Sequence, residues 1–115
     1  MSKLPGAKLS PRIENGALCW YAGDTFSLDI LLELTDTDGE PVTVGAADTL
    51  TLTVYDSCQT LVETISYTNV TGNRITLTVD EIRTAKYPPG AYRYTLRLTH
   101  GQNTTLAWDN PILVE

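Results

Sequence analysis

The sequence predicts an all-β sandwich of seven to eight short antiparallel strands with one short helical turn. Apolar and polar residues alternate in several stretches, as they do in strands that have one buried and one solvated face. Clusters of glycine, proline, asparagine and aspartate separate these stretches about every ten residues, which is typical of a sandwich or a small barrel. The 115 residues suit a single domain that is large enough to bury its own core.

Residues 1–16 are predicted to form an extended arm or linker in front of the sandwich, which then occupies residues 17–115. The arm contains two prolines and two glycines and shows little apolar periodicity. Arms of this kind often lie against a neighbouring subunit, and simple disorder is the alternative. The first short strand is expected at residues 18–21.

The most regular strand is expected at residues 26–34, where five apolar residues share one face: Phe26, Leu28, Ile30, Leu32 and Leu34. The Asp-Thr-Asp-Gly sequence at residues 36–39 ends this strand as a turn, because these residues favour local backbone turns. A loop is expected from there to residue 47.

A hairpin is expected next. Its first strand alternates over residues 49–55, and its turn lies at residues 56–59. The facing of its second strand, residues 61–68, stays open because two apolar residues are adjacent at the start. Residues 74–79 alternate again after a Thr-Gly-Asn turn, so a further strand is predicted there.

Asp80 is predicted to be the N-cap of the helical turn, with Ile82 and Ala85 on its inner face. Two prolines and a glycine end that turn, and the following strand places Tyr92 and Tyr94 on its buried face. The rest of the chain predicts a hairpin turn at residues 101–103, a strand at residues 105–109, a break at Asn110 and Pro111, and a final strand at residues 112–114.

The chain is acidic, with 14 acidic and 8 basic residues and a formal net charge of -6. Phosphate groups repel such a chain, so nucleic acid and anionic membranes are unfavourable partners. The first 15 residues lack the apolar core of a secretion signal, and a protein that is cytosolic or passively released is expected. Cys19 and Cys58 are therefore expected to be reduced thiols.

No motif points to catalysis, a cofactor or a metal. His100 precedes a glycine and has no catalytic partner near it in the sequence, so a solvated histidine is expected. Asp36, Asp38 and Glu40 resemble part of a calcium loop, but the flanking ligands of such a loop are missing and an acidic turn is expected. No pair of carboxylates stands out as a glycosidase pair.

Three aromatic residues, Trp20, Tyr21 and Tyr55, are candidate partner contacts. Large aromatic side chains bury much area at a small entropic cost, which makes them effective at interfaces. Trp108 follows the core pattern and is expected in the interior.

Three short motifs resemble a known family: Gly-Asp-Thr-Phe at residues 23–26, Asp-Gly-Glu-Pro-Val at residues 38–42, and Pro-Gly-Ala-Tyr-Arg-Tyr at residues 89–94. Over about residues 17–115 the chain resembles the immunoglobulin-like domain of phage baseplate upper proteins and related prophage tail proteins. The resemblance implies a non-enzymatic virion component, assembled in the bacterial cytoplasm, that joins other tail proteins and often forms homo-oligomers. It implies no catalytic residue and no cofactor. Larger members continue into long helical, receptor-proximal parts, so a short adaptor or structural subunit is expected here.

Two other functional classes are consistent with a small sandwich. A bacterial carbohydrate-binding or adhesion module would expose aromatic residues on one face. A small hydrolase would have an apolar pocket with a carboxylate or histidine of shifted pKa.

Overall fold

The computed structural model describes residues 9–115 and shows a two-layer β-sandwich in that part of the chain. The predicted all-β class is confirmed, as is the short helical turn. In chain order the elements are β1 Arg12–Glu14, β2 Ala17–Trp20, β3 Phe26–Leu31, β4 Thr49–Asp56, β5 Leu61–Tyr67, β6 Arg74–Val79, α1 Glu81–Thr84, β7 Gly90–His100 and β8 Asn103–Val114.

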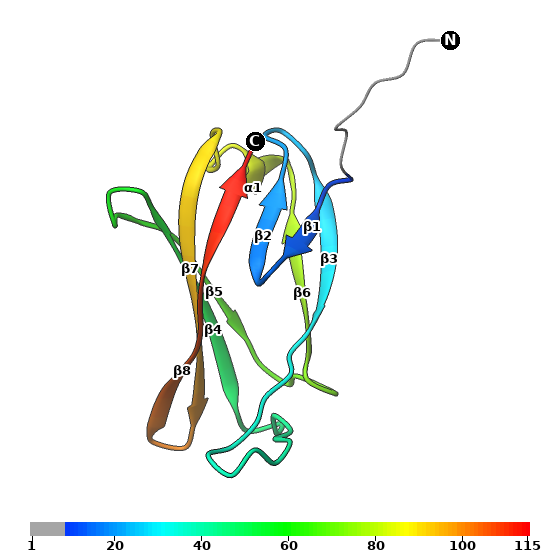
Figure 1. Ribbon diagram of the computed structural model, residues 1–115, viewed down its shortest axis with the longest axis vertical. Helices are drawn as coiled ribbons and strands as arrows, with labels where there is room; N and C mark the ends of the chain where they lie inside the picture. The colour runs from blue at the N-terminus through cyan, green and yellow to red at the C-terminus, as the bar shows by residue number, and fades with distance from the viewer. Residues whose placement is uncertain (1–8) are drawn as a thin grey trace.

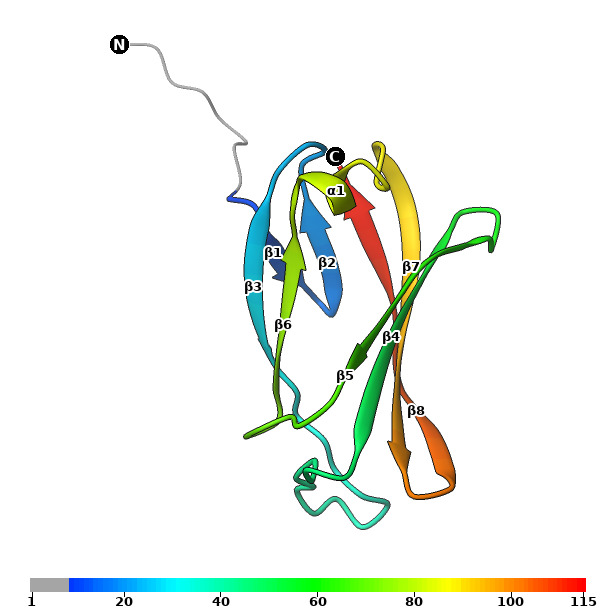
Figure 2. The same ribbon diagram turned by 180° about the vertical axis from the view of Figure 1, so that it is seen from behind.

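The two layers differ in size. The larger sheet has the strand order β1-β2-β8-β7-β4-β5, and the smaller sheet is the antiparallel pair of β3 and β6. Helix α1 and the C-terminus lie at one end of the sandwich, the upper end in Figures 1 and 2. The turn between β7 and β8 and the long loop after β3 lie at the opposite, lower end.

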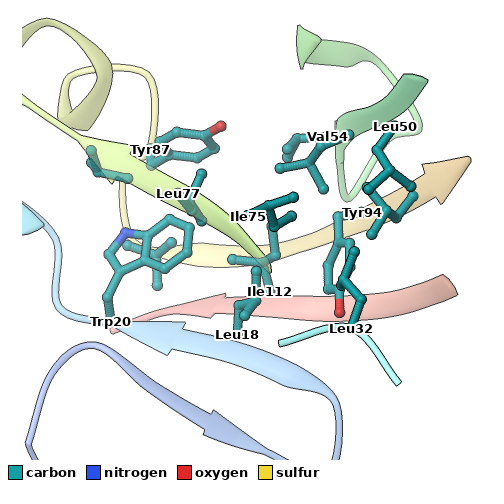
Figure 3. Close-up of a cluster of buried hydrophobic side chains, with 14 of the residues drawn as sticks. Leu18, Trp20, Leu32, Leu50, Val54, Ile75, Leu77, Tyr87, Tyr94 and Ile112 are labelled. Carbon is teal, nitrogen blue, oxygen red and sulfur yellow. The ribbon is translucent and has the colours of Figure 1, made fainter. Parts of the chain in front are cut away.

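The core lies between the two sheets and follows the predicted alternation. Leu50 and Leu52 on β4 and Leu77 on β6 are all buried in one cluster. Figure 3 shows Trp20 and Tyr87 at one end of this cluster and Leu50 at the other. Burial of these side chains is the main force that holds the layers together.

The first strand lies inside the segment that the sequence predicts to be an arm. Arg12 pairs with Cys19 across a hairpin, and the turn residues Asn15 and Gly16 have positive φ angles of 51° and 84°. An Asn-Gly pair in this conformation forms the tight turn that best matches the twist of two strands. The predicted boundary between the arm and the sandwich, at residue 17, is therefore wrong, because the sandwich already includes the chain from Arg12. Residues 1–8 of the predicted arm lie outside the described part of the chain.

The last strand also differs from the prediction. β8 continues through Asn110 and Pro111, where a break is predicted. A proline is tolerated in a strand where its nitrogen needs no partner, and pairing of β8 with β2 starts only at Ile112. This β2–β8 pair is parallel, so the predicted antiparallel arrangement holds for the other named strand pairs but not for this one.

Helix α1 begins as predicted but faces differently. The Asp80 side chain accepts hydrogen bonds from the backbone N–H groups of Ile82 and Arg83, at 3.1 and 2.9 Å. Ile82 is 79% exposed and Ala85 is exposed as well, so the predicted inner face is wrong. A single turn is too short to bury a face, and the chain returns to the core only at Tyr87.

The two cysteines differ in their exposure. Cys58 is an exposed, free thiol in the turn after β4, whereas Cys19 is buried in β2. Within residues 9–115, no helix has the length and apolar character needed to cross a membrane.

Candidate functional site

An apolar groove runs along one open side of the sandwich. It consists of two adjoining cavities of about 320 and 390 Å³ that share Glu33 and Trp108. Residues 30–35 form one wall and residues 105–108 form much of the other, with Ile13 and Gly16 at one end. We call this feature the open-side groove.

Both walls of the open-side groove include strand edges that lack a neighbour in the described part of the chain. β3 pairs with β6 on one side and has no second partner strand. β2 pairs with β8 only over Ile112–Val114, which leaves residues 103–111 of β8 without a neighbour on that side. Unpaired strand edges offer backbone N–H and C=O groups that an added strand can use.

Large aliphatic side chains are exposed at the rim of the groove. Leu31 is 53% exposed, Ile13 49% and Leu106 45%, although they come from three different strands. Scattered surface leucines are normal, but apolar residues that gather around a hollow mark an interaction surface. The groove is therefore the described feature best suited to bind an apolar segment.

A β-bulge in β8 brings Trp108 into the groove. Leu96 pairs with Trp108 and the next residue, Arg97, pairs with Leu106, so Ala107 is the extra residue. Bulges bend a strand and re-aim its side chains. Trp108 is consequently half-buried and lines both cavities, whereas alternation alone predicts a fully interior residue.

The β3 side of the groove is strongly acidic. Glu33 lines both cavities, and Asp29, Asp36 and Glu40 are exposed on the same stretch of chain. Residues 26–40, which include β3 and the turn after it, contain five acidic residues and no lysine or arginine. This charge favours a partner that carries basic residues.

The acidic turn after β3 is stabilised by its own hydrogen bonds. Oδ1 of Asp36 accepts the backbone N–H groups of Asp38 and Glu40, at 2.9 and 3.0 Å. Aspartate commonly supports turns in this way. Among residues 9–115, no three or more His, Cys, Asp or Glu side chains are grouped so that they could hold a metal ion.

A buried carboxylate lies at the upper end, away from the groove. Glu63 on β5 accepts a 2.6 Å hydrogen bond from the Tyr87 hydroxyl, and Arg83 and Lys86 approach it to 3.3 and 3.5 Å. Burial, and then the bond to Glu63, raise the pKa of Tyr87. This cluster ties β5 to the segment after α1, and the sequence leaves it undetected because the facing of β5 is open.

Tyr87→Phe is expected to lower the free energy of unfolding by about 1–3 kcal/mol, because it leaves a buried carboxylate oxygen without its hydrogen bond. Tyr92→Phe is the matched control, since the Tyr92 hydroxyl donates to the exposed carbonyl of Pro88. We expect a loss of about 1 kcal/mol or less there. Urea denaturation of both variants checks this, and equal losses would contradict the assigned role of Glu63.

The single histidine pairs with a distant aspartate at the lower end. The His100 side chain is 78% exposed, as predicted, and its Nδ1 contacts Oδ1 of Asp48. The other carboxylate oxygen of Asp48 accepts the Gly45 backbone N–H at 2.8 Å. The bond from Gly45 and then the one to His100 lower the pKa of Asp48. Neither Asp48 nor His100 lines the open-side groove.

The lowered pKa of Asp48 predicts a pH dependence of stability. The folded state favours the ionised carboxylate, so Asp48 stabilises the fold above its ordinary pKa of 3.8 and loses this effect as the pH falls below that value. Asp48→Asn is expected to flatten this part of the stability profile, measured by urea denaturation at several pH values. His100→Ala should keep part of the slope because the bond from Gly45, the largest single cause, remains. Equal slopes in Asp48→Asn and the unmodified chain would contradict the prediction.

The three predicted contact aromatics lie outside the groove. Trp20 is only 1% exposed and packs against Phe26 and Tyr87, with ring centroids 5.3 and 5.4 Å away. This burial contradicts the prediction that Trp20 is a partner contact, because its strand lies in the sheet with that side chain facing the core. Tyr21 and Tyr55 are half-buried beneath arginine side chains, and their contact role stays a prediction.

No family model and no curated protein matches the chain. Its function is therefore inferred from the open-side groove, from the distribution of charge, and from the motifs at residues 23–26, 38–42 and 89–94.

Proposed function

We propose that this chain is a non-enzymatic structural subunit of a phage or prophage tail and that it assembles through the open-side groove. Its partners are copies of itself, other tail proteins, or both. The observation that carries this proposal is an apolar groove flanked by two unpaired strand edges, with Leu31 and Leu106 exposed at its rim. Such a surface favours association because it removes apolar area from water.

The lining of the groove suits docking better than acid–base chemistry. Glu33 is the single carboxylate among the residues that line the two cavities. Tyr94, which also lines it, donates a 3.0 Å hydrogen bond to the Gly16 carbonyl, and burial raises the pKa of its hydroxyl. That bond holds the β1–β2 turn against β7, which is a structural role.

The choice of tail proteins as partners is supported by the sequence resemblance. We include an immunoglobulin-like fold in the proposal, and the order of the strands supports it. The chain passes from the small sheet (β3) to the large one (β4 and β5), back to the small one (β6), and again to the large one (β7 and β8). Crossings of this kind are typical of immunoglobulin-like sandwiches. A virion component of this type is assembled in the bacterial cytoplasm.

Light scattering over a range of protein concentrations tests self-assembly. We expect a mass that exceeds the 12.6 kDa of one chain and rises with concentration. A mass that stays at one chain up to millimolar concentration would exclude assembly with copies of itself.

A further inference from the structure

We propose that residues 1–9 of a second copy of this chain fill the open-side groove, with Leu4 as the apolar side chain that enters it. The proposal rests on the proposed function, because it names the occupant of the same groove. It makes the interface a head-to-tail contact in which one copy supplies the segment and the next supplies the groove.

The basic charge of residues 1–9 complements the acidic side of the groove. Residues 1–8 contain Lys3 and Lys8 and no acidic residue, whereas the β3 side of the groove carries Glu33 and its acidic neighbours. Basic residues next to an apolar anchor complement an apolar groove with an acidic wall. The basic residues elsewhere in the chain are built into or directly follow folded elements: Arg12 in β1, Arg74 in β6, Arg83 in α1, Lys86 after α1, and Arg93 and Arg97 in β7.

A symmetric contact between two grooves is less favourable. It would bring Glu33 of one copy, which lines both cavities, close to Glu33 of the other. Like charges that face each other across an interface oppose association. The basic segment avoids this repulsion and adds attraction instead.

The length of the segment fits the groove. One wall is formed by residues 30–35, which in an extended strand span about 20 Å. Nine extended residues reach about 30 Å, so the segment can cover that wall and still leave a short connection. Leu9, the last residue of the segment, is 89% exposed, so the rest of the described chain leaves it largely uncovered.

The chain that follows the segment is held at Ser10. The Ser10 hydroxyl accepts a 3.2 Å hydrogen bond from the backbone N–H of Tyr21, and the adjacent Ala22 donates to the carbonyl of Glu115. A second copy is the acceptor because the proposed function is assembly, and binding in the chain's own groove is one outcome of the test below.

Two variants that fail separately and work together test the proposal. Leu4→Asp removes the apolar side chain of the segment. Leu106→Lys places a charge at the exposed rim of the groove, where folding is little affected. Each variant alone is expected to associate about tenfold more weakly or worse than the unmodified chain. An equal mixture should form a 1:1 complex, because intact segments from the Leu106→Lys copies enter intact grooves of the Leu4→Asp copies. Leu4→Ile should associate like the unmodified chain.

Sedimentation velocity and intrinsic tryptophan fluorescence separate the outcomes, because Trp108 lines the groove whereas Trp20, the second tryptophan, is buried in the core. Recovery of the complex in the mixture supports the proposal. If Leu4→Asp associates normally while Leu106→Lys does not, the groove has another occupant and this inference fails, although the proposed function stands. If the unmodified chain stays monomeric and Leu4→Asp still changes tryptophan fluorescence, the segment fills the groove of its own copy, which overturns the proposal. If every chain is monomeric and fluorescence is unchanged, self-assembly itself is refuted.

Discussion

Replacing Trp20 with alanine is expected to lower the free energy of unfolding by about 3–5 kcal/mol. The side chain is 1% exposed and packs against Phe26 and Tyr87, so its removal leaves a cavity that the surrounding strands can fill only in part. Urea denaturation followed by circular dichroism measures the loss. The effect is large because it removes both apolar burial and aromatic contacts.

Trp108→Ala is the control for this prediction. Trp108 is half-buried and lines the open-side groove, so its removal should cost less stability and should weaken association instead. If Trp20→Ala kept the stability of the unmodified chain but lost association, Trp20 would be a partner contact after all. That result would contradict the core described above.

Leu31→Lys is expected to abolish self-association at concentrations where the unmodified chain associates. Leu31 is 53% exposed on the groove, so the substitution removes an apolar contact and puts a charge where a partner must exclude water. The fold should be little affected because the lysine can reach solvent in the free chain. Sedimentation velocity measures the association, and thermal unfolding checks the fold.

Leu61→Lys is the matched control for Leu31→Lys. Leu61 is 58% exposed on β5, at the opposite edge of the large sheet from β1. The two substitutions make the same chemical change at similar exposure, and we expect Leu61→Lys to associate normally. Equal loss in both variants would mean that added positive charge, rather than the groove, controls association.

Strands with a local pattern are predictable from this sequence. The alternation of residues 49–55 and 74–79 correctly predicts β4 and β6, because one face of each strand is buried. β1 is missed because its signal is a turn, Asn15 and Gly16, in a segment that otherwise shows little periodicity. The continuation of β8 through Pro111 is missed because it depends on where a neighbouring strand stops.

The candidate site depends on features that no local pattern contains. Its walls, residues 30–35 and residues 105–108, are about seventy positions apart in the sequence and meet only through the packing of two sheets. The bulge at Ala107 decides that Trp108 faces the groove, and alternation cannot reveal a bulge. Trp20 is misjudged for a related reason, since a four-residue strand is too short to show which face is buried.

Amide hydrogen exchange at low and at high protein concentration is the most direct test of assembly through the open-side groove. We expect association to slow exchange in residues 30–35 and 105–108, whose backbone forms the two walls, and to leave β5 unchanged. Slower exchange confined to β5 or to the turn between β4 and β5, with the groove residues unchanged, would contradict the account.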